Sequence, residues 1–335
     1  MRSLRSLYIA WIVAASTSCA QTAGPTTLPG TSFDGPLPAL TGAQRAMADR
    51  LGGHVRALAA DIGERHVGKP EGLERAAAYI EQALRADGYA VGQQAFEARG
   101  VTVRNVEAEI KGTTSPDEVV VIGAHYDSAQ GAPAANDNGT GVAALLEIAR
   151  ALKAAKPART VRLVFFANEE PPFFRTPLMG SVQYARRCAE RHENVVAMLC
   201  LETIGYYSDD EGSQHYPAPY DRFFPSQGNF LAFVSDPPST ELLQEVVGAF
   251  RASAKFPSEG IAAPPQVVGI GFSDHWSFWQ SGYRAVMATD TALFRDPMYH
   301  RAGDAPDRLD FAKLARVTEG LIDVTRTLGR FPKEK

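Results

Sequence analysis

The sequence predicts a single α/β domain with a mostly parallel central sheet and helices on both faces of that sheet. Two observations predict this three-layer sandwich. Short apolar runs with strand character alternate with longer runs of helical periodicity along most of the chain. One of the strand-like runs, residues 119–124 (VVVIGA), is continuously apolar, which is typical of a strand covered on both faces. We detect no internal repeat, so we expect one domain over residues 43–331.

The elements of the N-terminal half follow from their periodicity. Residues 43–61 and 70–88 have the apolar spacing of helices, and residues 101–110 alternate as a half-buried strand does. The stripe of the second helix consists of Leu73, Ala77, Ile80 and Leu84. After the buried strand at 119–124 we expect a helix over 139–154 and a strand over 161–167.

The C-terminal half continues the same alternation. We expect helices over 180–190, 240–254 and 310–328, and strands over 195–204, 230–234 and 284–289. The last helix has an apolar stripe made by Phe311, Leu314, Val317 and Leu321. Two loops, 171–179 and 205–229, are longer than this architecture needs, and long loops in compact domains are often functional.

The composition excludes several classes of protein. The 335 residues are 45% apolar and 21% charged, which is enough to bury a sizeable core. The formal net charge of −4 lacks the basic excess of a nucleic-acid binder. Three cysteines exclude a disulfide-built scaffold. Cys188 and Cys200 would form either a disulfide or two buried thiols, and their spacing is compatible with both.

The N-terminus has the order of a secretory signal. Residues 1–20 carry two arginines, then an apolar stretch, then small residues. Cleavage after Ala20 would release a soluble protein, whereas cleavage before Cys19 would leave a lipid-anchored cysteine. We therefore expect an exported protein, periplasmic or extracellular. Residues 21–42, rich in Gly, Pro, Thr and Ser, are expected to be a flexible tether, and no later apolar run approaches the roughly 20 residues of a transmembrane helix.

Acidic residues and histidines gather where the predicted strands end. Ligands of doubly wound sheets bind beyond the carboxyl ends of the strands. Each residue alone has an ordinary interpretation as a turn, a helix cap or a solvated loop. Together they form a carboxylate and imidazole cluster that suits Zn²⁺ or a similar metal. The cluster consists of His125, Asp127, Asp137, Glu169, Glu170, Glu202 and His300.

The motifs that hold these residues resemble one known family. HYDS, NDNGTG, NEE and a late YH followed by Asp304 resemble the zinc-dependent exopeptidases, which include bacterial leucyl aminopeptidases, glutamate carboxypeptidases and glutaminyl cyclases. The resemblance covers roughly residues 100–310. NEEPPFF and LETIGYYSD further resemble a bacterial branch of that family.

The resemblance implies a set of metal ligands. His125 would bind one zinc, Asp137 would bridge two zincs, Glu170 would bind the other, and His300 would complete the set. Glu202 departs from the common pattern, in which Asp is the remaining ligand. Because Glu is one methylene longer, it either ligates differently or only accepts a hydrogen bond beside the metal. Two zincs per chain are expected, and the occupancy of the second site depends on how Glu202 binds.

The resemblance also implies two catalytic roles. Glu169, beside a ligand but not itself one, would be the general base. Asp127 would accept a hydrogen bond from the His125 ring, which fixes the tautomer and raises ligand basicity. The family often has a cis peptide after the bridging aspartate, here between Asp137 and Asn138.

The substrate pocket is less well defined by the sequence. Asp274 and His275, in the sequence SDHW, resemble a family element near the pocket and are expected to form or support its wall. Tyr206 and Tyr207 would line a specificity pocket or simply pack in the core.

The resulting hypothesis is a secreted zinc aminopeptidase, in which a metal-bound hydroxide attacks the peptide bond and Glu169 acts as the base. Its substrates would be peptides. A glutaminyl cyclase shares the fold and uses one zinc, but Trp would be expected where Tyr299 stands. A carboxypeptidase would need a cationic pocket, for which Arg175, Arg295 and Arg301 are candidates. A non-catalytic binding ectodomain is disfavoured because all ligand types are present.

Overall fold

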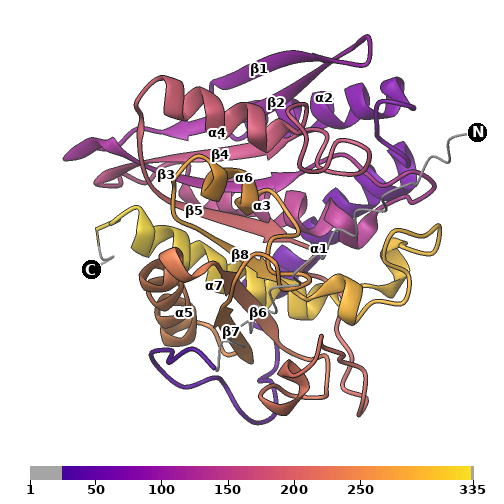
Figure 1. The fold of residues 1–335 in the computed structure, drawn as a ribbon, viewed down its shortest axis with the longest axis vertical. Helices are drawn as coiled ribbons and strands as arrows, with labels where there is room; N and C mark the ends of the chain where they lie inside the picture. The colour runs from indigo at the N-terminus through magenta and orange to yellow at the C-terminus, as the bar shows by residue number, and fades with distance from the viewer. Residues whose placement is uncertain (1–24, 333–335) are drawn as a thin grey trace, which may run out of the picture.

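The computed structural model describes residues 25–332, which form one sheet with helices on both sides (Figure 1). The strands are β1 (Val91–Ala98), β2 (Val101–Ile110), β3 (Ser115–His125), β4 (Arg159–Phe166), β5 (Asn194–Glu202), β6 (Leu231–Ser235), β7 (Ser258–Ala262) and β8 (Ala285–Thr289). The helices are α1 (Gly42–Arg56), α2 (Pro70–Ala86), α3 (Gly141–Leu152), α4 (Gly180–Glu190), α5 (Thr240–Ser253), α6 (His275–Gln280) and α7 (Phe311–Leu328).

The strands follow the order β1-β2-β4-β3-β5-β8-β6-β7 across the sheet. The four central strands, β4, β3, β5 and β8, are parallel to one another. Antiparallel pairs join β1 to β2, β2 to β4 and β8 to β6, while the edge pair of β6 and β7 is parallel. The predicted α/β fold is confirmed, and the parallel centre brings the carboxyl ends of β3, β4, β5 and β8 to one edge.

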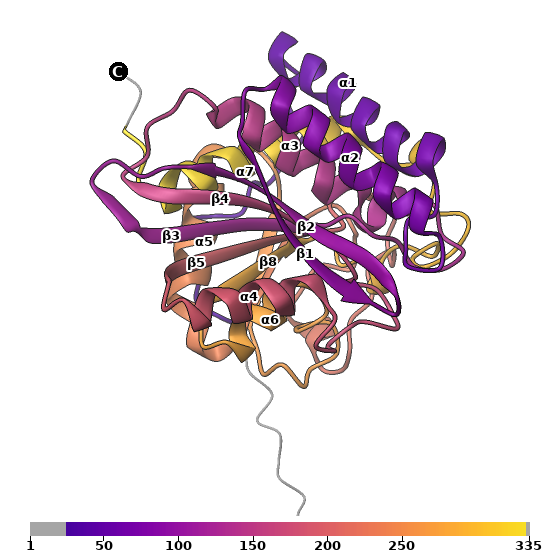
Figure 2. The ribbon, with the colours of Figure 1, turned by 90° about the horizontal axis from the view of Figure 1, so that it is seen from above.

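The helices form a layer on each face of the sheet, as the view from above shows (Figure 2). Helices α1, α2, α3 and α7 lie on one face, and α4 and α6 lie on the other. Residues alternate between the two cores along β3, since Val120 and Ile122 belong to the first core while Val119 and Val121 belong to the second. This double coverage explains why the strand is apolar at every position.

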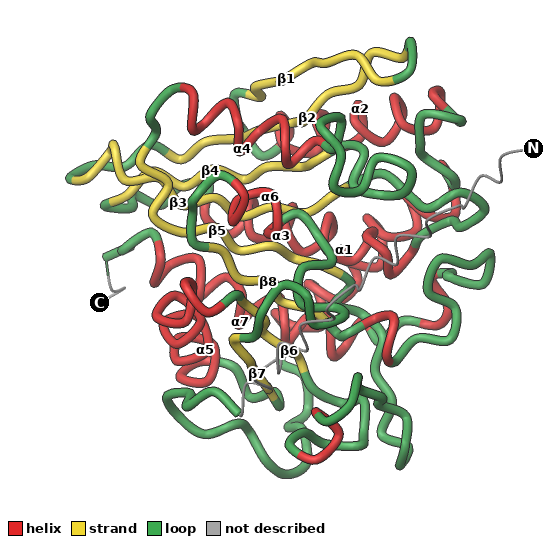
Figure 3. Tube along the Cα trace, viewed as in Figure 1, coloured by secondary structure: helices red, strands yellow, loops and turns green. Residues whose placement is uncertain are grey.

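Among the described strands and α-helices, three were not predicted from the sequence because each has a weak local pattern; Figure 3 shows where they lie. Strand β1 is an edge strand with mostly half-exposed or exposed side chains, so it lacks an apolar signal. Strand β7 has only five residues and contains a glycine. Helix α6 has six residues, too few for helical periodicity to be recognised.

The segment expected to be a flexible tether lies on the domain over its described residues, 25–41. The Ala262 backbone N–H donates to Thr26 Oγ1 (2.8 Å), and the Ser258 N–H donates to Ser32 Oγ (2.8 Å). Leu28 packs against the first core. The segment therefore occupies donors of the edge strand β7 that would otherwise face solvent.

The remaining sequence expectations concern the signal and the cysteines. The proposed signal, residues 1–20 with Cys19, lies outside the described residues. Among the helices of residues 25–332, none has the length and apolar character needed to cross a membrane. Cys188 on α4 and Cys200 on β5 are buried free thiols, so of the two alternatives the structure has the thiols and not the disulfide.

Candidate metal centre

The predicted metal ligands meet at the carboxyl edge of the sheet. His125 ends β3, Glu202 ends β5, and Glu170 lies in the loop that follows β4. Asp137 lies in the turn before α3, and His300 comes from the long segment after β8. The structure groups these five residues into two sets of three that share Asp137.

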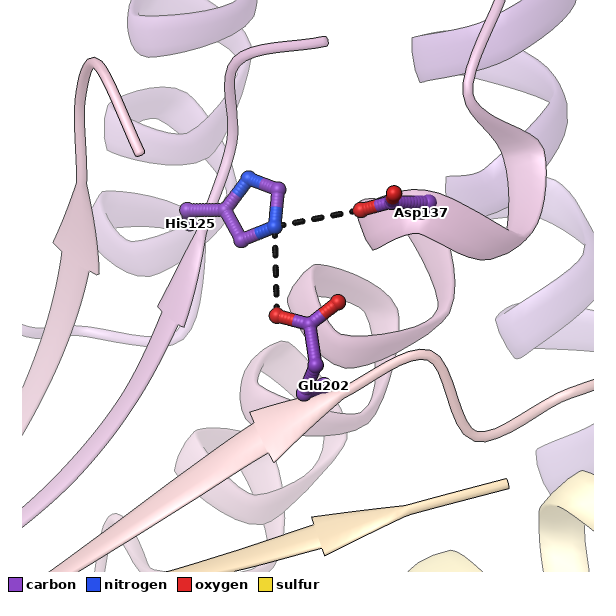
Figure 4. A group of neighbouring side chains, drawn as sticks. All are labelled: His125, Asp137 and Glu202. Atoms are coloured by element: carbon purple, nitrogen blue, oxygen red, sulfur yellow. Dashed lines mark ion pairs between the residues drawn. The ribbon is translucent and has the colours of Figure 1, made fainter. Parts of the chain in front are cut away.

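The first set consists of His125, Asp137 and Glu202 (Figure 4). The Nε2 atom of His125 lies 3.2 Å from Asp137 Oδ1 and 3.2 Å from Glu202 Oε2. The longer side chain of Glu202 thus still reaches the set. Its Oε2 atom also accepts a hydrogen bond from Ser273 Oγ (2.6 Å), which fixes the carboxylate.

The second set consists of Asp137, Glu170 and His300. The Nε2 atom of His300 lies 3.0 Å from Asp137 Oδ2 and 3.1 Å from Glu170 Oε2. Each oxygen of Asp137 therefore faces a different histidine, as a bridging carboxylate would. Burial alone would lower the pKa of His300, but the two facing carboxylates raise it to about 11.

These ligand atoms fit a cation. Both carboxylate oxygens of Asp137 and both of Glu170 are buried and accept no hydrogen bond from the described residues. Buried carboxylates are costly unless a donor or a metal compensates them. Two imidazoles with several carboxylates form the nitrogen and oxygen set that zinc accepts. The residues present thus suit zinc, which binds once the histidines have given up their protons.

The position of Asp137 is fixed by the segments around it. The Asp304 carboxylate accepts hydrogen bonds from the backbone N–H of Asn136 (2.7 Å) and of Asp137 (3.1 Å). The Asn138 side chain donates to Leu201 O (2.8 Å), which ties the turn to β5. The peptide bond between Asp137 and Asn138 is cis, as the family resemblance implied.

Asp127 connects the histidine to the NEE motif. Its two oxygens accept hydrogen bonds from the backbone N–H groups of Glu169 (3.0 Å) and Glu170 (3.1 Å). Its Oδ1 also lies 3.4 Å from Nδ1 of His125 and faces the ring, but this nitrogen forms no hydrogen bond within the described residues, so the predicted hydrogen bond is not formed. Glu169 Oε2 lies 3.9 Å from His125 Nε2, close to the first set but in neither set. Burial raises the pKa of the Glu169 carboxyl group well above its ordinary value.

One residue of the site was missed by sequence reasoning. Arg65 is fully buried, and its guanidinium donates hydrogen bonds only to backbone carbonyls in the described structure. The acceptors are Tyr126 O (2.7 Å), Pro133 O (2.6 Å), Ala134 O (2.8 Å), Gly63 O (3.1 Å) and Leu58 O (3.4 Å). These bonds fix the loop between β3 and the Asp137 turn. Nothing in the sequence around Arg65 distinguishes it from a surface arginine.

A largely apolar cavity opens beside the metal sets. Its empty volume is about 810 Å³, which includes space open to solvent. Glu202 and Tyr299 line it on the metal side, and the Tyr299 ring stacks on the His300 ring with centroids 3.9 Å apart. Most of the wall is aromatic or aliphatic and comes from loops around residues 216–224, 267–272 and 291–294.

The four residues expected at the substrate pocket lie outside the lining of this cavity. The Tyr207 hydroxyl donates to Ile204 O (2.8 Å) and its ring packs edge-on against Phe256, so it is a packing residue. The Tyr206 ring lies under the Arg308 guanidinium.

The other two pocket candidates are fully buried. Nε2 of His275 lies 2.7 Å from Ile270 O, and burial lowers its pKa to about 4. Burial raises the pKa of Asp274 to about 7. The element SDHW instead contributes Ser273, through its bond to Glu202. The three arginines considered for a carboxylate-binding pocket are also absent from the lining.

The comparisons with known proteins identify the family of this chain. Residues 105–325 match the model of peptidase family M28, so the chain belongs to this zinc-dependent peptidase family. It is 37% identical over 288 residues to the uncharacterized protein YfbL of Escherichia coli K12, covering 83% of this chain and 88% of that protein.

Solved structures share the fold. The structure of BSAP, a zinc aminopeptidase from Bacillus subtilis, superposes with a TM-score of 0.67 at 15% identity, covering 86% of this chain and 96% of that chain. Fimbriiglobus ruber glutaminyl cyclase superposes with a TM-score of 0.63 at 20% identity, covering 88% and 98%. At these identities the likeness concerns the fold alone. The structures that share this fold include an aminopeptidase and a glutaminyl cyclase.

Proposed function

We propose that this protein is an exported aminopeptidase that binds two zinc ions and removes the N-terminal residue of peptides. The sharing of Asp137 between two three-residue sets is the observation that supports this proposal. A carboxylate whose two oxygens face two separate ligand sets can bridge two metals that lie side by side. That arrangement favours hydrolysis over the single-zinc chemistry of the cyclases.

The roles of the residues follow from their positions. His125, Asp137 and Glu202 would hold one zinc, and Asp137, Glu170 and His300 would hold the other. When bound, the zinc ions lower the pKa of a water molecule and polarise the scissile carbonyl. The chain's own residues then move the protons and orient the substrate.

Glu169 is the proton carrier in this proposal. Its carboxylate lies beside the first set without belonging to it, so it is free to accept a proton from the attacking water. Its raised pKa favours the protonated form of Glu169, which can then donate the proton to the leaving amine. Asp127 is a positioning residue, since its carboxylate accepts a hydrogen bond from the Glu169 backbone and faces the His125 ring. The neighbouring cavity would accept the side chain of the N-terminal residue.

The test is a Glu169→Gln variant of the purified protein, assayed with zinc on a peptide pool by mass spectrometry. We expect loss of single N-terminal residues from the wild type and an approximately 10²–10⁴-fold lower rate for the variant. Zinc content should be unchanged. Glu71→Gln, which removes an exposed carboxylate on α2, is the matched control. Near-wild-type activity of Glu169→Gln would overturn the base assignment, and cyclisation of N-terminal Gln in place of cleavage would make the protein a cyclase.

The export proposal has a separate test. Residues 1–20 have the pattern of a signal, and the two processing alternatives differ in mass. Mass spectrometry of the mature N-terminus should find either a chain starting at Gln21 or a lipid-modified Cys19. An intact Met1 in the mature protein would contradict export by this signal.

A further inference from the structure

A row of paired residues across the sheet runs from Glu202 at the metal site to a second carboxylate, that of Glu259. Strand pairing places Glu202 opposite Thr289, Thr289 opposite Ala232, and Ala232 opposite Glu259. These four residues lie on successive strands, β5, β8, β6 and β7, and all of them line the same cavity. The floor of the cavity is therefore a trough with a glutamate at each end and two small side chains between them.

The length of the trough follows from strand spacing. Three steps of 4.7–4.9 Å place the Glu202 and Glu259 backbones about 14 Å apart. The walls between them are apolar, with Phe224, Val234 and Ile270 among the lining residues. A long, flexible and apolar group would fill this space between the metal site and Glu259.

Glu259 has no directly bonded partner among residues 25–332. Its carboxylate forms neither a hydrogen bond nor an ion pair there, although the residue is half-buried. Burial raises the pKa of Glu259, while the charge of Arg251 lowers it less. The Arg251 guanidinium donates instead to Ser258 Oγ (3.1 Å) and Ser258 O (2.9 Å). When ionised, this partly desolvated carboxylate therefore has no cation in hydrogen-bond contact within the described residues, and the charge of Arg251 compensates it only in part.

We propose that Glu259 selects substrates whose N-terminal residue is lysine or arginine; this inference rests on the proposed aminopeptidase function. A lysine side chain extends about 6 Å from Cα to Nζ, as five single bonds of about 1.5 Å allow. A zinc ion held by Glu202 would add two metal–oxygen distances of about 2 Å, and a charged hydrogen bond to Glu259 would add about 2.8 Å. With the Cα–carbonyl bond of about 1.5 Å and the C=O bond of about 1.2 Å, the extended reach is about 15–16 Å, which is enough to span the trough of about 14 Å. The methylene groups would lie on the apolar walls while the cation meets Glu259.

The test compares substrates that differ only in charge. Aminoacyl coumarylamides of lysine and norleucine have side chains of similar length, as do those of arginine and citrulline. For the wild type we expect higher kcat/KM for the cationic member of each pair. In Glu259→Gln that preference should fall about 10- to 100-fold, the loss of one buried charged hydrogen bond. Turnover of the norleucine substrate should change less than about twofold, which is within the ordinary effect of a neutral substitution.

Glu245→Gln is the matched control, because it removes the same charge from an exposed position on α5. It should leave both preferences unchanged. If the wild type cleaves norleucine and lysine substrates equally and Glu259→Gln alters neither, the specificity inference is overturned while the aminopeptidase proposal stands. If the wild type releases no N-terminal residue from any substrate, the proposed function fails first. If Glu259→Gln misfolds, it will lose turnover of the norleucine substrate as well. In that case Glu259→Asp, which keeps the charge, is the test. The inference predicts that this variant retains a weakened preference for lysine, and no preference for lysine would overturn it.

Discussion

Arg65 provides the most quantitative prediction for the architecture of the site. Its side chain is fully buried and donates five hydrogen bonds to carbonyls of three separate segments. In Arg65→Met the carbonyls remain buried and lose their donors. Each hydrogen bond to a charged group contributes about 1.5–3 kcal/mol, but the bonds share one cation and the arginine also has a desolvation cost. We therefore expect a net loss of about 3–5 kcal/mol, the usual cost of removing one buried charged partner.

The assay is chemical denaturation followed by circular dichroism, with the zinc-loaded protein for both chains. Arg75→Met is the matched control, because Arg75 lies exposed on α2 with a single backbone acceptor, Asp61 O. That control should stay within about 0.5 kcal/mol of the wild type. Arg65→Lys should lose nearly as much stability as Arg65→Met, because an ammonium group cannot span the same five acceptors. An Arg65→Met protein that unfolds within about 1 kcal/mol of the wild type would refute the structural role of these hydrogen bonds.

Two further predictions concern metal content and pH. Because Asp137 belongs to both ligand sets, we expect His300→Ala to retain one zinc per chain by elemental analysis and Asp137→Ala to retain none; two zincs in Asp137→Ala would exclude the bridge. At Glu81, burial would raise the pKa, but hydrogen bonds from Arg104 (2.7 Å) and Arg85 (2.8 Å) outweigh it and lower the pKa. A carboxyl group whose pKa is lower in the folded state stabilises the fold at pH values above its unfolded-state pKa of about 4.3. This stabilisation is lost as the pH falls through the folded-state pKa. Glu81→Gln should therefore cost about 1–3 kcal/mol at pH 7 and progressively less below about pH 4, measured by urea unfolding at each pH; a cost independent of pH would contradict the ion pairs.

Much of the fold could be predicted because its central elements have strong local patterns. Helix α4 was predicted over the same residues that form it, 180–190, and the apolar run of β3 was recognised as a doubly covered strand. The metal ligands could be predicted for a related reason. His125 and Glu202 are the last residues of parallel strands, and such ends must meet at one edge. The sequence thus contained both the ligands and the rule that brings them together.

The substrate pocket could not be predicted in the same way. Its wall comes from three separate loops, and its floor depends on the pairing of β6, β7 and β8. Neither loop conformation nor strand order is encoded in a local period, so the sequence could not decide whether Tyr206 and Tyr207 line the pocket or pack in the core. Glu259 carried no signal at all, since a glutamate in a short, unrecognised strand resembles a surface residue.

The charges of the site explain why its supporting residues are as important as its ligands. Six buried carboxylates gather here, and when ionised they exceed the positive charge that the described chain offers nearby. They are Asp127, Asp137, Glu169, Glu170, Glu202 and Asp304. The fold compensates part of this charge with Arg65, whose neighbours include Asp304, Asp127 and Asp137, and with backbone N–H groups directed at Asp127 and Asp304. The oxygens of Asp137 and Glu170 accept no hydrogen bond from the described residues. Their negative charge is therefore left for divalent cations, which the proposed chemistry requires at the two ligand sets that share Asp137.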